Sequence, residues 1–400
     1  MRILVISQYF WPENFRINDI VLGLRDRGHE VVVLTGIPNY PSGQFFDGYG
    51  QNVHNEYWEG IKIYRSKLIS RGSGGGFRLL LNYFSFSFFA SIKALYIKED
   101  IDSILVFEPS PITVGIPAMV ARKKLGAPYF FWVQDLWPAS LTAAGGVKNK
   151  VILGLFDKLT RAIYKHANKV LIQSRTFKEY IVNQNVPEDK IIYLPNTTED
   201  YYFPIDQSLK YANLIPRGFN VIFAGNIGEA QSLDTFVDAA KILLERGYPI
   251  NWIVIGDGRY KASLERKVSD LGIDGNVYFL GKYPPTEMAD FFSHADALYV
   301  TLRKDYIFSL TIPSKLQSYL ACGKPIIASL DGEGAKIVEE SGSGFVSPAE
   351  DVEGLVDNVI KMYELTHENR IMLGSKGLDY FNREFKREIV LHRLEKLLQE

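Results

Sequence analysis

The stretch TIPSKLQSYLACGKPIIAS, Thr311–Ser329, decides how the rest of the chain is interpreted. Ser314 precedes a short amphipathic run and Gln317 follows three residues later, which is the spacing of a capping box at a helix start. A glycine then predicts the end of the helix, before a buried strand over Pro325–Ala328. A helix start favours an anion, and Lys315 adds a full positive charge there. Taken alone, the stretch is equally compatible with a phosphate site and with a capped helix beside a solvated lysine.

The composition is that of a globular chain with room for two domains. Its 400 residues are 46% hydrophobic, which suits two cores of ordinary size, and the formal net charge is -1. This balance gives no support to nucleic-acid binding as the main activity. Cys322 is the single cysteine, so no disulfide can form within the chain, and a reducing cytosol is expected. The N-terminal apolar run Ile3–Ile6 is too short for a signal segment and is interpreted as a first strand.

An uncharged apolar run, Leu79–Ile92, is bounded by Arg78 and Lys93. As a helix it would reach roughly 21 Å, whereas the hydrocarbon core of a bilayer is about 30 Å thick. We therefore expect it not to span a membrane. Two interpretations remain, a helix packed in the first-domain core and a helix lying in the interface of an anionic membrane.

The first half of the chain alternates strands and helices. Arg2–Ser7 and Glu30–Thr35 are apolar strands separated by a helix, which predicts a parallel sheet. Such sheets bind ligands at the carboxyl ends of their strands. Glu108 and Asp135 each follow a strand, so either carboxylate is a candidate base or hydroxyl ligand, or else caps the next segment. The loop after the first strand adds Glu13, Asn14 and Arg16 as candidate acceptor-site residues.

A segment with three prolines, Leu194–Asn220, predicts a linker, and a second strand–helix series follows it. The first two strands of this series end in the loops GNIG and GDG, which either admit a ligand to the backbone or make tight turns. Neither is the dinucleotide fingerprint G-x-G-x-x-G. Two such loops at one sheet edge with the helix start at Ser314 favour a diphosphate ligand. The glycines concerned are Gly225, Gly228, Gly256 and Gly258.

No residue pattern predicts a metal site. The six histidines are scattered, with no H-x-x-x-H or H-E-x-x-H spacing. The D-x-D pair Asp100 and Asp102 precedes a strand instead of following one. We expect no essential metal and no other cofactor.

At these residues the chain resembles family 4 glycosyltransferases of the GT-B fold, which are retaining enzymes. In the first half the resemblance rests on PENFRINDIVLGLRDRGHEVVVLTGIPNYPSG and WVQDLWPAS. In the second half it rests on LPNTTEDYYF, FAGNIGEAQSLDTFVDAA, GDGRYKASLE and IPSKLQSYLACGKPIIA. The most similar branch is that of O-antigen and capsule enzymes described as L-fucosamine or N-acetyl-L-fucosamine transferases.

The resemblance implies an α/β fold of two Rossmann-like, doubly wound domains that face a cleft. Residues 1–195 would bind the acceptor and residues 196–383 the nucleotide sugar, with the C-terminal helix 384–400 packing back on the first domain. The expected reaction moves a sugar from a UDP-sugar to a polyprenyl-diphosphate-linked acceptor in surface polysaccharide synthesis. The enzyme would work in the cytoplasm, in peripheral contact with the inner face of the plasma membrane.

The chain departs from the family pattern on the phosphate loop. Asn226 and Gln231 stand where the family commonly has Arg and Lys. Lys315 is then the best remaining cation for the phosphates, followed by Arg303 and Lys282.

The chain also departs from the family in its acidic and histidine positions. Leu310 and Ser318 stand about where two glutamates would fall. Gln134, next to Asp135, replaces a frequent first-domain histidine. The usual set of ligand contacts therefore cannot be copied across, and the ribose contact is unassigned.

Retention without a covalent intermediate requires the leaving diphosphate to be stabilised on the face where the acceptor attacks. Lys315, the helix start at Ser314 and the amides of Asn226–Gly228 would share this task, while Asp135 would orient the acceptor hydroxyl or the donor sugar. The expected catalytic residues are Asp135, Lys315 and Glu108.

Two alternatives to a transferase stay open. A GT-B nucleotide-sugar 2-epimerase would not need an apolar first-domain surface. A two-domain binding protein without catalysis is usually exported.

Overall fold

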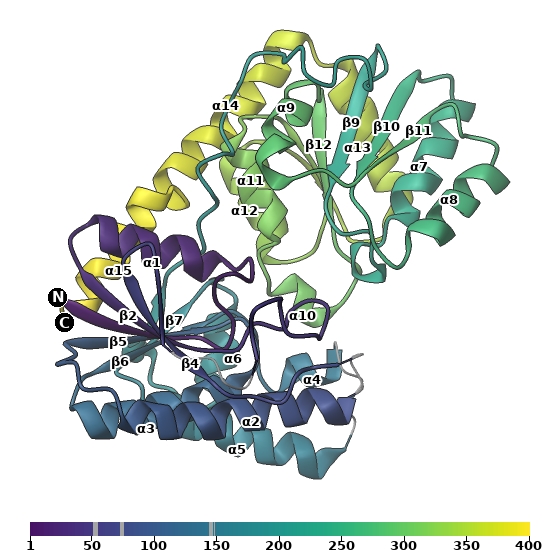
Figure 1. The fold of residues 1–400 in the computed structure, drawn as a ribbon. Helices are drawn as coiled ribbons and strands as arrows, with labels where there is room; N and C mark the ends of the chain where they lie inside the picture. Colours follow the sequence, from purple (N-terminus) through teal and green to yellow (C-terminus); the bar gives the residue numbers. More distant parts are fainter. Residues whose placement is uncertain (51–54, 73–75, 144–146, 148) are drawn as a thin grey trace. The chain divides into compact units, whose positions relative to one another are not determined.

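The computed structural model describes residues 1–50, 55–72, 76–143, 147 and 149–400. They form two units, each built on one sheet with helices on both faces (Figure 1). One unit comprises Met1–Pro195 and Val390–Glu400, and the other Asn196–Ile389. The predicted α/β class with two parallel sheets is confirmed.

The first unit contains a sheet with the strand order β3-β4-β2-β1-β5-β6-β7-β8. Its neighbouring strands are parallel, except for the antiparallel pair of β3 and β4 at one edge. The sequence did not predict β3, because three residues are too few for a period-two pattern. The strands are β1 (Arg2–Ile6), β2 (Glu30–Gly36), β3 (Glu56–Trp58), β4 (Ile61–Ser66), β5 (Ser103–Glu108), β6 (Tyr129–Val133), β7 (Lys169–Ile172) and β8 (Ile191–Tyr193).

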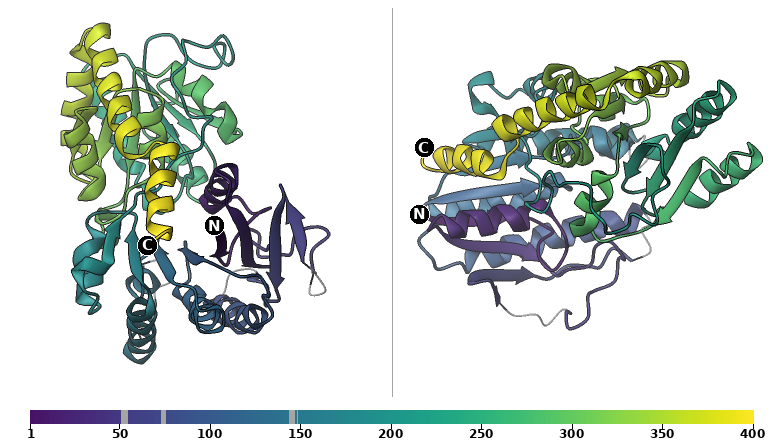
Figure 2. Two further views of the ribbon diagram at one scale, coloured as in Figure 1. Left: turned by 90° about the vertical axis from the view of Figure 1, so that its left-hand side faces the viewer. Right: turned by 90° about the horizontal axis from the view of Figure 1, so that it is seen from above.

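The helices of the first unit are α1 (Arg16–Asp26), α2 (Gly76–Leu95), α3 (Gly115–Leu125), α4 (Ala139–Ala143), α5 (Lys150–His166) and α6 (Phe177–Asn183). Helices α2, α3 and α5 form a layer on one face of the sheet, which is visible in both figures (Figures 1 and 2). The predicted apolar run becomes the 20-residue helix α2. Within the described parts of the chain, no helix combines the length and the hydrophobicity needed to cross a bilayer.

The second unit has a sheet of parallel strands in the order β11-β10-β9-β12-β13-β14. The strands are β9 (Phe219–Ala224), β10 (Ile250–Ile255), β11 (Val277–Gly281), β12 (Ala297–Thr301), β13 (Ile326–Ser329) and β14 (Gly344–Ser347). The helices are α7 (Asp234–Glu245), α8 (Lys261–Asp270), α9 (Met288–Ser293), α10 (Tyr306–Ser309), α11 (Ser314–Ala321), α12 (Glu333–Ser341), α13 (Val352–Glu364) and α14 (His367–Glu384). One core lies beneath α9, α11 and α12, and the other beneath α7, α8 and α13.

The strand order of each sheet reverses at one point, between β1 and β5 in the first unit and between β9 and β12 in the second. Loops that leave neighbouring strands in opposite directions open a crevice at such a point. The GNIG loop after β9 lies at the second reversal, and the loop after β1, which contains Glu13, lies at the first.

The helix that the sequence predicted over residues 384–400 is present but starts three residues later, and α14, which precedes it, ends at Glu384. After α14, Phe385 is fully buried in a core of the second unit, and α15 (Arg387–Leu398) starts two residues later. From α15, Val390, Leu391, Leu394 and Leu398 enter the first-unit core that also contains α1. The carboxylate of Glu395 accepts hydrogen bonds from Arg27 at 3.1 Å and His29 at 2.9 Å.

Candidate functional site

The glycine loops after β9 and β10 contact each other directly. The Gly225 N–H donates to the Ile255 carbonyl at 2.9 Å, and the Ile227 N–H donates to the Asp257 carbonyl at 2.8 Å. Gly225 and Gly256 have φ angles of +147° and +146°, and a Cβ on Gly256 would lie 1.9 Å from the Gly225 carbonyl oxygen. Both positions therefore require glycine, because a side chain would push the two loops apart.

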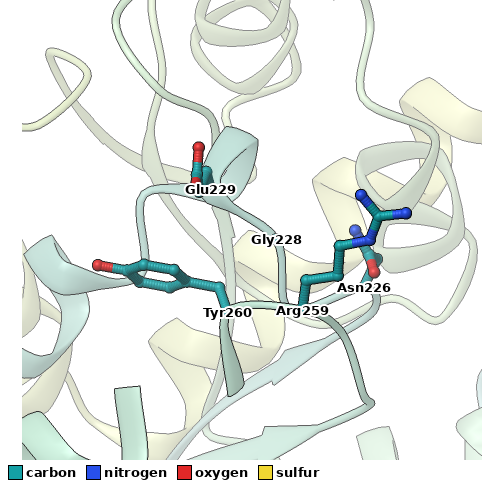
Figure 3. A pocket seen from close by; sticks show the side chains of 5 residues that line it. All are labelled: Asn226, Gly228, Glu229, Arg259 and Tyr260. Carbon is teal, nitrogen blue, oxygen red and sulfur yellow. The ribbon is translucent and has the colours of Figure 1, made fainter. Parts of the chain in front are cut away.

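A pocket of about 380 Å³ opens beside these loops. Figure 3 shows Arg259 and Asn226 at one side of it and Tyr260 and Glu229 at the other. Asn226 and Gly228 were predicted from the sequence, whereas Arg259, which lies in the motif GDGRYKASLE, was not. The missed signal was an arginine directly after a glycine loop. The lining residues are Asn226, Gly228, Glu229, Arg259 and Tyr260.

Helix α11 is attached to the end of β9, and this attachment places Lys315 at the glycine loop. The Ala224 N–H donates to the Tyr319 hydroxyl at 2.9 Å. Lys315 Nζ donates a hydrogen bond to Gln231 Oε1 and lies 4.0 Å from the ring centroid of Phe223. The predicted neighbourhood of Lys315, Gln231 and the loop after β9 is thus present in the structure.

The Lys315 ammonium group lies in a poorly solvated position. Burial lowers the pKa of Lys315 from its ordinary 10.5 to about 7, because a charged group loses hydration there. Its described contacts are the neutral side-chain amide of Gln231 and the ring face of Phe223. Neither group carries a negative charge, so the positive charge of Lys315 can still attract an anion.

The capping box predicted at Ser314 and Gln317 is wrong. Ser314 is the first helical residue of α11, and the N-cap is Pro313, which has no side-chain acceptor. Gln317 Nε2 instead donates to the Asn196 carbonyl at 2.6 Å. Tertiary contact with the segment before β9 has therefore taken the side chain that the local pattern assigned to the cap.

The other predicted cations differ in their relation to this site. The Arg303 N–H donates to the Ala230 carbonyl at 2.9 Å, which joins the loop after β12 to the turn that contains Gln231. Its guanidinium group lies 5.8 Å from the ring centroid of Phe308. Lys282 follows β11 and is exposed, and among the described residues it does not line the pocket.

The two positions expected for the family's glutamates take other roles in this chain. The Ser318 hydroxyl lies 3.0 Å from the Thr198 hydroxyl, within hydrogen-bond distance. Leu310 is the C-cap residue of α10.

In the first unit, the two candidate catalytic carboxyl groups end neighbouring strands. Asp135 follows β6, is partly buried and accepts a hydrogen bond from the Ser140 hydroxyl at 2.5 Å. Burial raises the pKa of Asp135, and the Ser140 hydrogen bond offsets part of this effect. Glu108 ends β5 with no exposed surface, and burial, then the charge of Asp135, raises its pKa well above the ordinary value. Glu108, which the sequence predicted as a catalytic residue, therefore has no surface open to a ligand in this structure.

The loop after β1 is held by Glu13. This side chain is only 2% exposed, and its carboxylate accepts backbone hydrogen bonds from Asn39 at 2.8 Å, Tyr40 at 2.7 Å and Phe10 at 3.3 Å. Burial raises the pKa of Glu13 to about 7, although these three donors oppose the shift. Glu13 therefore orders two loops at the carboxyl edge of the sheet.

The other two residues predicted in this loop have different settings. Asn14 is exposed, and Arg16 is the first residue of α1.

In the described residues, no group of three His, Cys, Asp or Glu side chains is arranged to hold a metal ion.

Two family models match the chain, one in each half. Residues 14–197 match the glycosyl transferase 4-like domain, and residues 218–365 match the glycosyl transferases group 1 model. The putative colanic acid biosynthesis glycosyl transferase WcaI of Escherichia coli is 24% identical over 413 residues, covering 98% of each chain.

Solved structures show the same fold. Sucrose-phosphate synthase from Thermosynechococcus elongatus matches with a TM-score of 0.77 and 16% identity, covering 99% of this chain and 98% of that chain. Anabaena HepE, solved in complex with UDP, matches with a TM-score of 0.72 and 15% identity, covering 100% and 99%. With a glycosyl transferase 4-like domain in its first half and a group 1 domain in its second, the chain belongs to the glycosyltransferases of the GT-B fold.

Proposed function

We propose that this glycosyltransferase moves a sugar, with retention, from a UDP-sugar to a polyprenyl-diphosphate-linked acceptor. The observation that carries the proposal is Lys315, whose weakly solvated ammonium group contacts a neutral amide beside the glycine loop of the second unit. A diphosphate is an anion of the kind that glycine-loop backbone and a nearby cation can bind together. UDP as its nucleotide is supported by the complex of HepE, which has the same fold.

In the proposed reaction, an acceptor oxygen forms a bond to the anomeric carbon as the bond from that carbon to the diphosphate oxygen breaks. Negative charge then develops on the leaving UDP, and the acceptor proton passes to a phosphate oxygen on the same face. Lys315 and the backbone N–H groups of Asn226 and Gly228 stabilise this charge, whereas the Ile227 N–H, which the sequence also assigned to this task, already donates to the Asp257 carbonyl. Arg259, at the pocket wall, supplies a second positive charge in place of the neutral Asn226 and Gln231.

The first unit is proposed to bind the acceptor. Asp135 follows β6 and is only partly buried, so its carboxylate can accept a hydrogen bond from a sugar hydroxyl and orient it. We propose that Glu108, whose buried carboxyl group lies close enough to interact electrostatically with Asp135, is a positioning residue. We propose that the loop containing Asn14 and Arg16 contributes to acceptor binding, and that Glu13 orders this loop.

The biological setting is proposed from relatives. WcaI is described as a colanic acid enzyme, and a further relative, AmsK of Erwinia amylovora, as an amylovoran biosynthesis glycosyltransferase. We propose a role in surface polysaccharide synthesis, such as O-antigen or capsule, at the inner face of the plasma membrane. N-acetyl-L-fucosamine is the proposed sugar, and the reaction is proposed to need no metal.

The test incubates the enzyme with UDP-N-acetyl-L-fucosamine, UDP-N-acetylglucosamine, UDP-glucose or UDP-galactose, with and without a short-chain polyprenyl-diphosphate sugar. The expected product is a lengthened lipid-linked saccharide with the anomeric configuration of the donor, formed equally in EDTA. Asp135→Asn should lower turnover without changing UDP affinity. An epimerised nucleotide sugar formed without acceptor, an inverted product, or binding without transfer would each contradict the proposal.

A further inference from the structure

The outer face of α2 carries a row of large apolar side chains, which we call the α2 stripe: Phe77, Leu81, Phe84, Phe88, Ile92 and Leu95. Their spacing of three or four residues places them along one side of the helix. All are exposed, with Phe77 at 76% and Phe88 at 63%. Helix α5 contacts the stripe through Phe156, whose ring centroid lies 5.9 Å from that of Phe84, and it exposes Val151 at 72% and Leu155 at 63%.

The inner face of the same helix is fully used by the first unit. Tyr83, Phe86 and Ala90 are buried, and Ser87 donates a hydrogen bond to the Thr113 carbonyl at 2.7 Å. Packing in the core of the first unit therefore accounts for the apolar residues on the inner face of α2, but not for those on its outer face. Of the twenty large hydrophobic side chains exposed in the described residues, seven lie on this helix, which is the concentration expected of a binding surface.

The helices around the stripe are strongly basic. Helices α2, α3 and α5 contain nine lysines and arginines and one acidic residue, Asp157, which pairs with Arg161 at 2.9 Å. The whole chain, in contrast, has 45 basic and 46 acidic residues. This excess predicts an anionic partner for this layer. Its exposed basic residues are Arg78, Lys123, Lys124, Lys150, Lys158 and Lys165.

We propose that the α2 stripe lies in the interface of an anionic lipid membrane, with α2 parallel to the surface and the surrounding lysines on lipid phosphates. Apolar side chains beside a basic surround are the composition of an interfacial helix. The occupant is a bilayer because the apolar row and its surrounding cations need hydrocarbon and negative charge over one broad area. The inference deepens the proposed function, since it assigns the surface that would bring the enzyme to a lipid-linked acceptor, but its observations are independent of the donor site.

The expected effects are large enough to measure. Neutralising one lysine near an anionic membrane lowers the partition coefficient about fivefold, so two lower it roughly 25-fold. Removing one inserted phenylalanine lowers it roughly tenfold. Added salt should weaken binding, because it screens the lysine–phosphate attraction.

The experiment is flotation of the full-length protein with phosphatidylglycerol vesicles and with phosphatidylcholine vesicles, without nucleotide. Wild type is expected to float with phosphatidylglycerol at low salt. The doubly substituted Phe77→Gln/Phe88→Gln and Lys123→Gln/Lys124→Gln proteins should each lose at least tenfold in binding. The matched control is Leu209→Gln/Ile371→Gln, which removes two exposed apolar side chains from the second unit and should bind as wild type.

Two further measurements make the result decisive. Thermal melting shows that each variant is folded, which is expected because the substituted side chains are exposed. Transfer to a water-soluble acceptor analogue should be unchanged in the stripe variants, so failure of the membrane inference and failure of the proposed reaction are separately visible. Wild type that stays unbound to phosphatidylglycerol, stripe variants that bind like wild type, or a stripe that instead mediates dimers in sedimentation would overturn the inference.

Discussion

Lys315→Met is the most informative single substitution, because it removes one charge and keeps the length of the side chain. The ammonium group lies beside the Gly225 loop, where a Cβ on that glycine would be 3.2 Å from Nζ. A phosphate oxygen about 4 Å from Nζ gains roughly 4 kcal/mol at an effective dielectric constant of about 20. Loss of one such donor to a developing oxyanion costs about 2.7–4 kcal/mol, so turnover should fall roughly 100- to 1,000-fold.

Titration of Lys315 adds a pH signature to this prediction. With a pKa of about 7 in the free enzyme, part of the population is neutral at neutral pH, and a bound diphosphate raises that pKa. UDP binding therefore takes up a proton above pH 7, and affinity should fall as the pH rises. Calorimetry between pH 6.5 and 9 should show that the UDP affinity of wild type falls as the pH rises. In Lys315→Met, UDP affinity should be weaker and should not change with pH over this range.

The same shift determines the effect on stability. The folded-state pKa of about 7 is below the ordinary 10.5, so the charged form is disfavoured by folding and stability rises with pH between these two values. The penalty is fully present below about pH 7. Lys315→Met removes it, so its melting temperature should equal or exceed that of wild type, most clearly at low pH.

Lys336→Met, at an exposed lysine of α12, is the control for loss of a charge in the same unit. It should leave turnover and UDP affinity unchanged. Near-normal turnover and normal UDP affinity in folded Lys315→Met would refute the phosphate role.

The remaining predictions concern the neighbouring loops and the loop of the first unit. Arg259→Gln should weaken UDP binding about fivefold or more in titration calorimetry with an unchanged melting temperature, because it removes the cation from the pocket wall; unchanged affinity would contradict that role. Gly256→Ala should lower both stability and UDP binding, because its Cβ would lie 1.9 Å from the Gly225 carbonyl oxygen, and an unaltered denaturation midpoint would show that the loops can separate freely. Ser314→Ala should change the free energy of unfolding by less than about 0.5 kcal/mol, since Ser314 is not the N-cap; a loss near 1 kcal/mol would restore the capping interpretation. Glu13→Ala should lower the free energy of unfolding by about 1–3 kcal/mol through lost backbone hydrogen bonds. Because folding raises the pKa of Glu13 from 4.5 to about 7, its contribution to stability should decline as pH rises between these values and change little above, which acid and neutral denaturation curves of wild type and variant can compare.

The glycine loops could be predicted from sequence because their requirement is local. Gly225 and Gly256 adopt positive φ angles that other residues rarely tolerate, and they follow apolar strands that are evident from composition. Lys315 could equally be predicted, because it lies in the first turn of a short amphipathic helix whose start is evident from the sequence. Parallel strands end at one sheet edge, so the proximity of these loops followed from the strand–helix alternation.

The capping box failed for the opposite reason. The spacing of Ser314 and Gln317 matches the motif, yet Gln317 bonds to a carbonyl 121 residues earlier in the chain. Similarly, Glu13 has the chemistry of a binding residue, and only the folded loops around Asn39 show that its carboxylate is already used. A side chain's hydrogen-bond partner depends on which distant segments pack beside it in the folded chain, and sequence spacing does not show this.

The sequence by itself determined the two strand–helix series, the glycine loops and the position of Lys315, because these depend on hydrophobic period and backbone freedom within a few residues. Only the tertiary structure decided that Arg259 lines the pocket, that Glu108 is enclosed beside Asp135, and that α2 buries one face while exposing the other. The apolar run Leu79–Ile92 has the same composition whether one or both sides of its helix are covered. Burial is a property of what packs against a residue, and the neighbours of α2 come from strands and helices between Glu30 and Leu125.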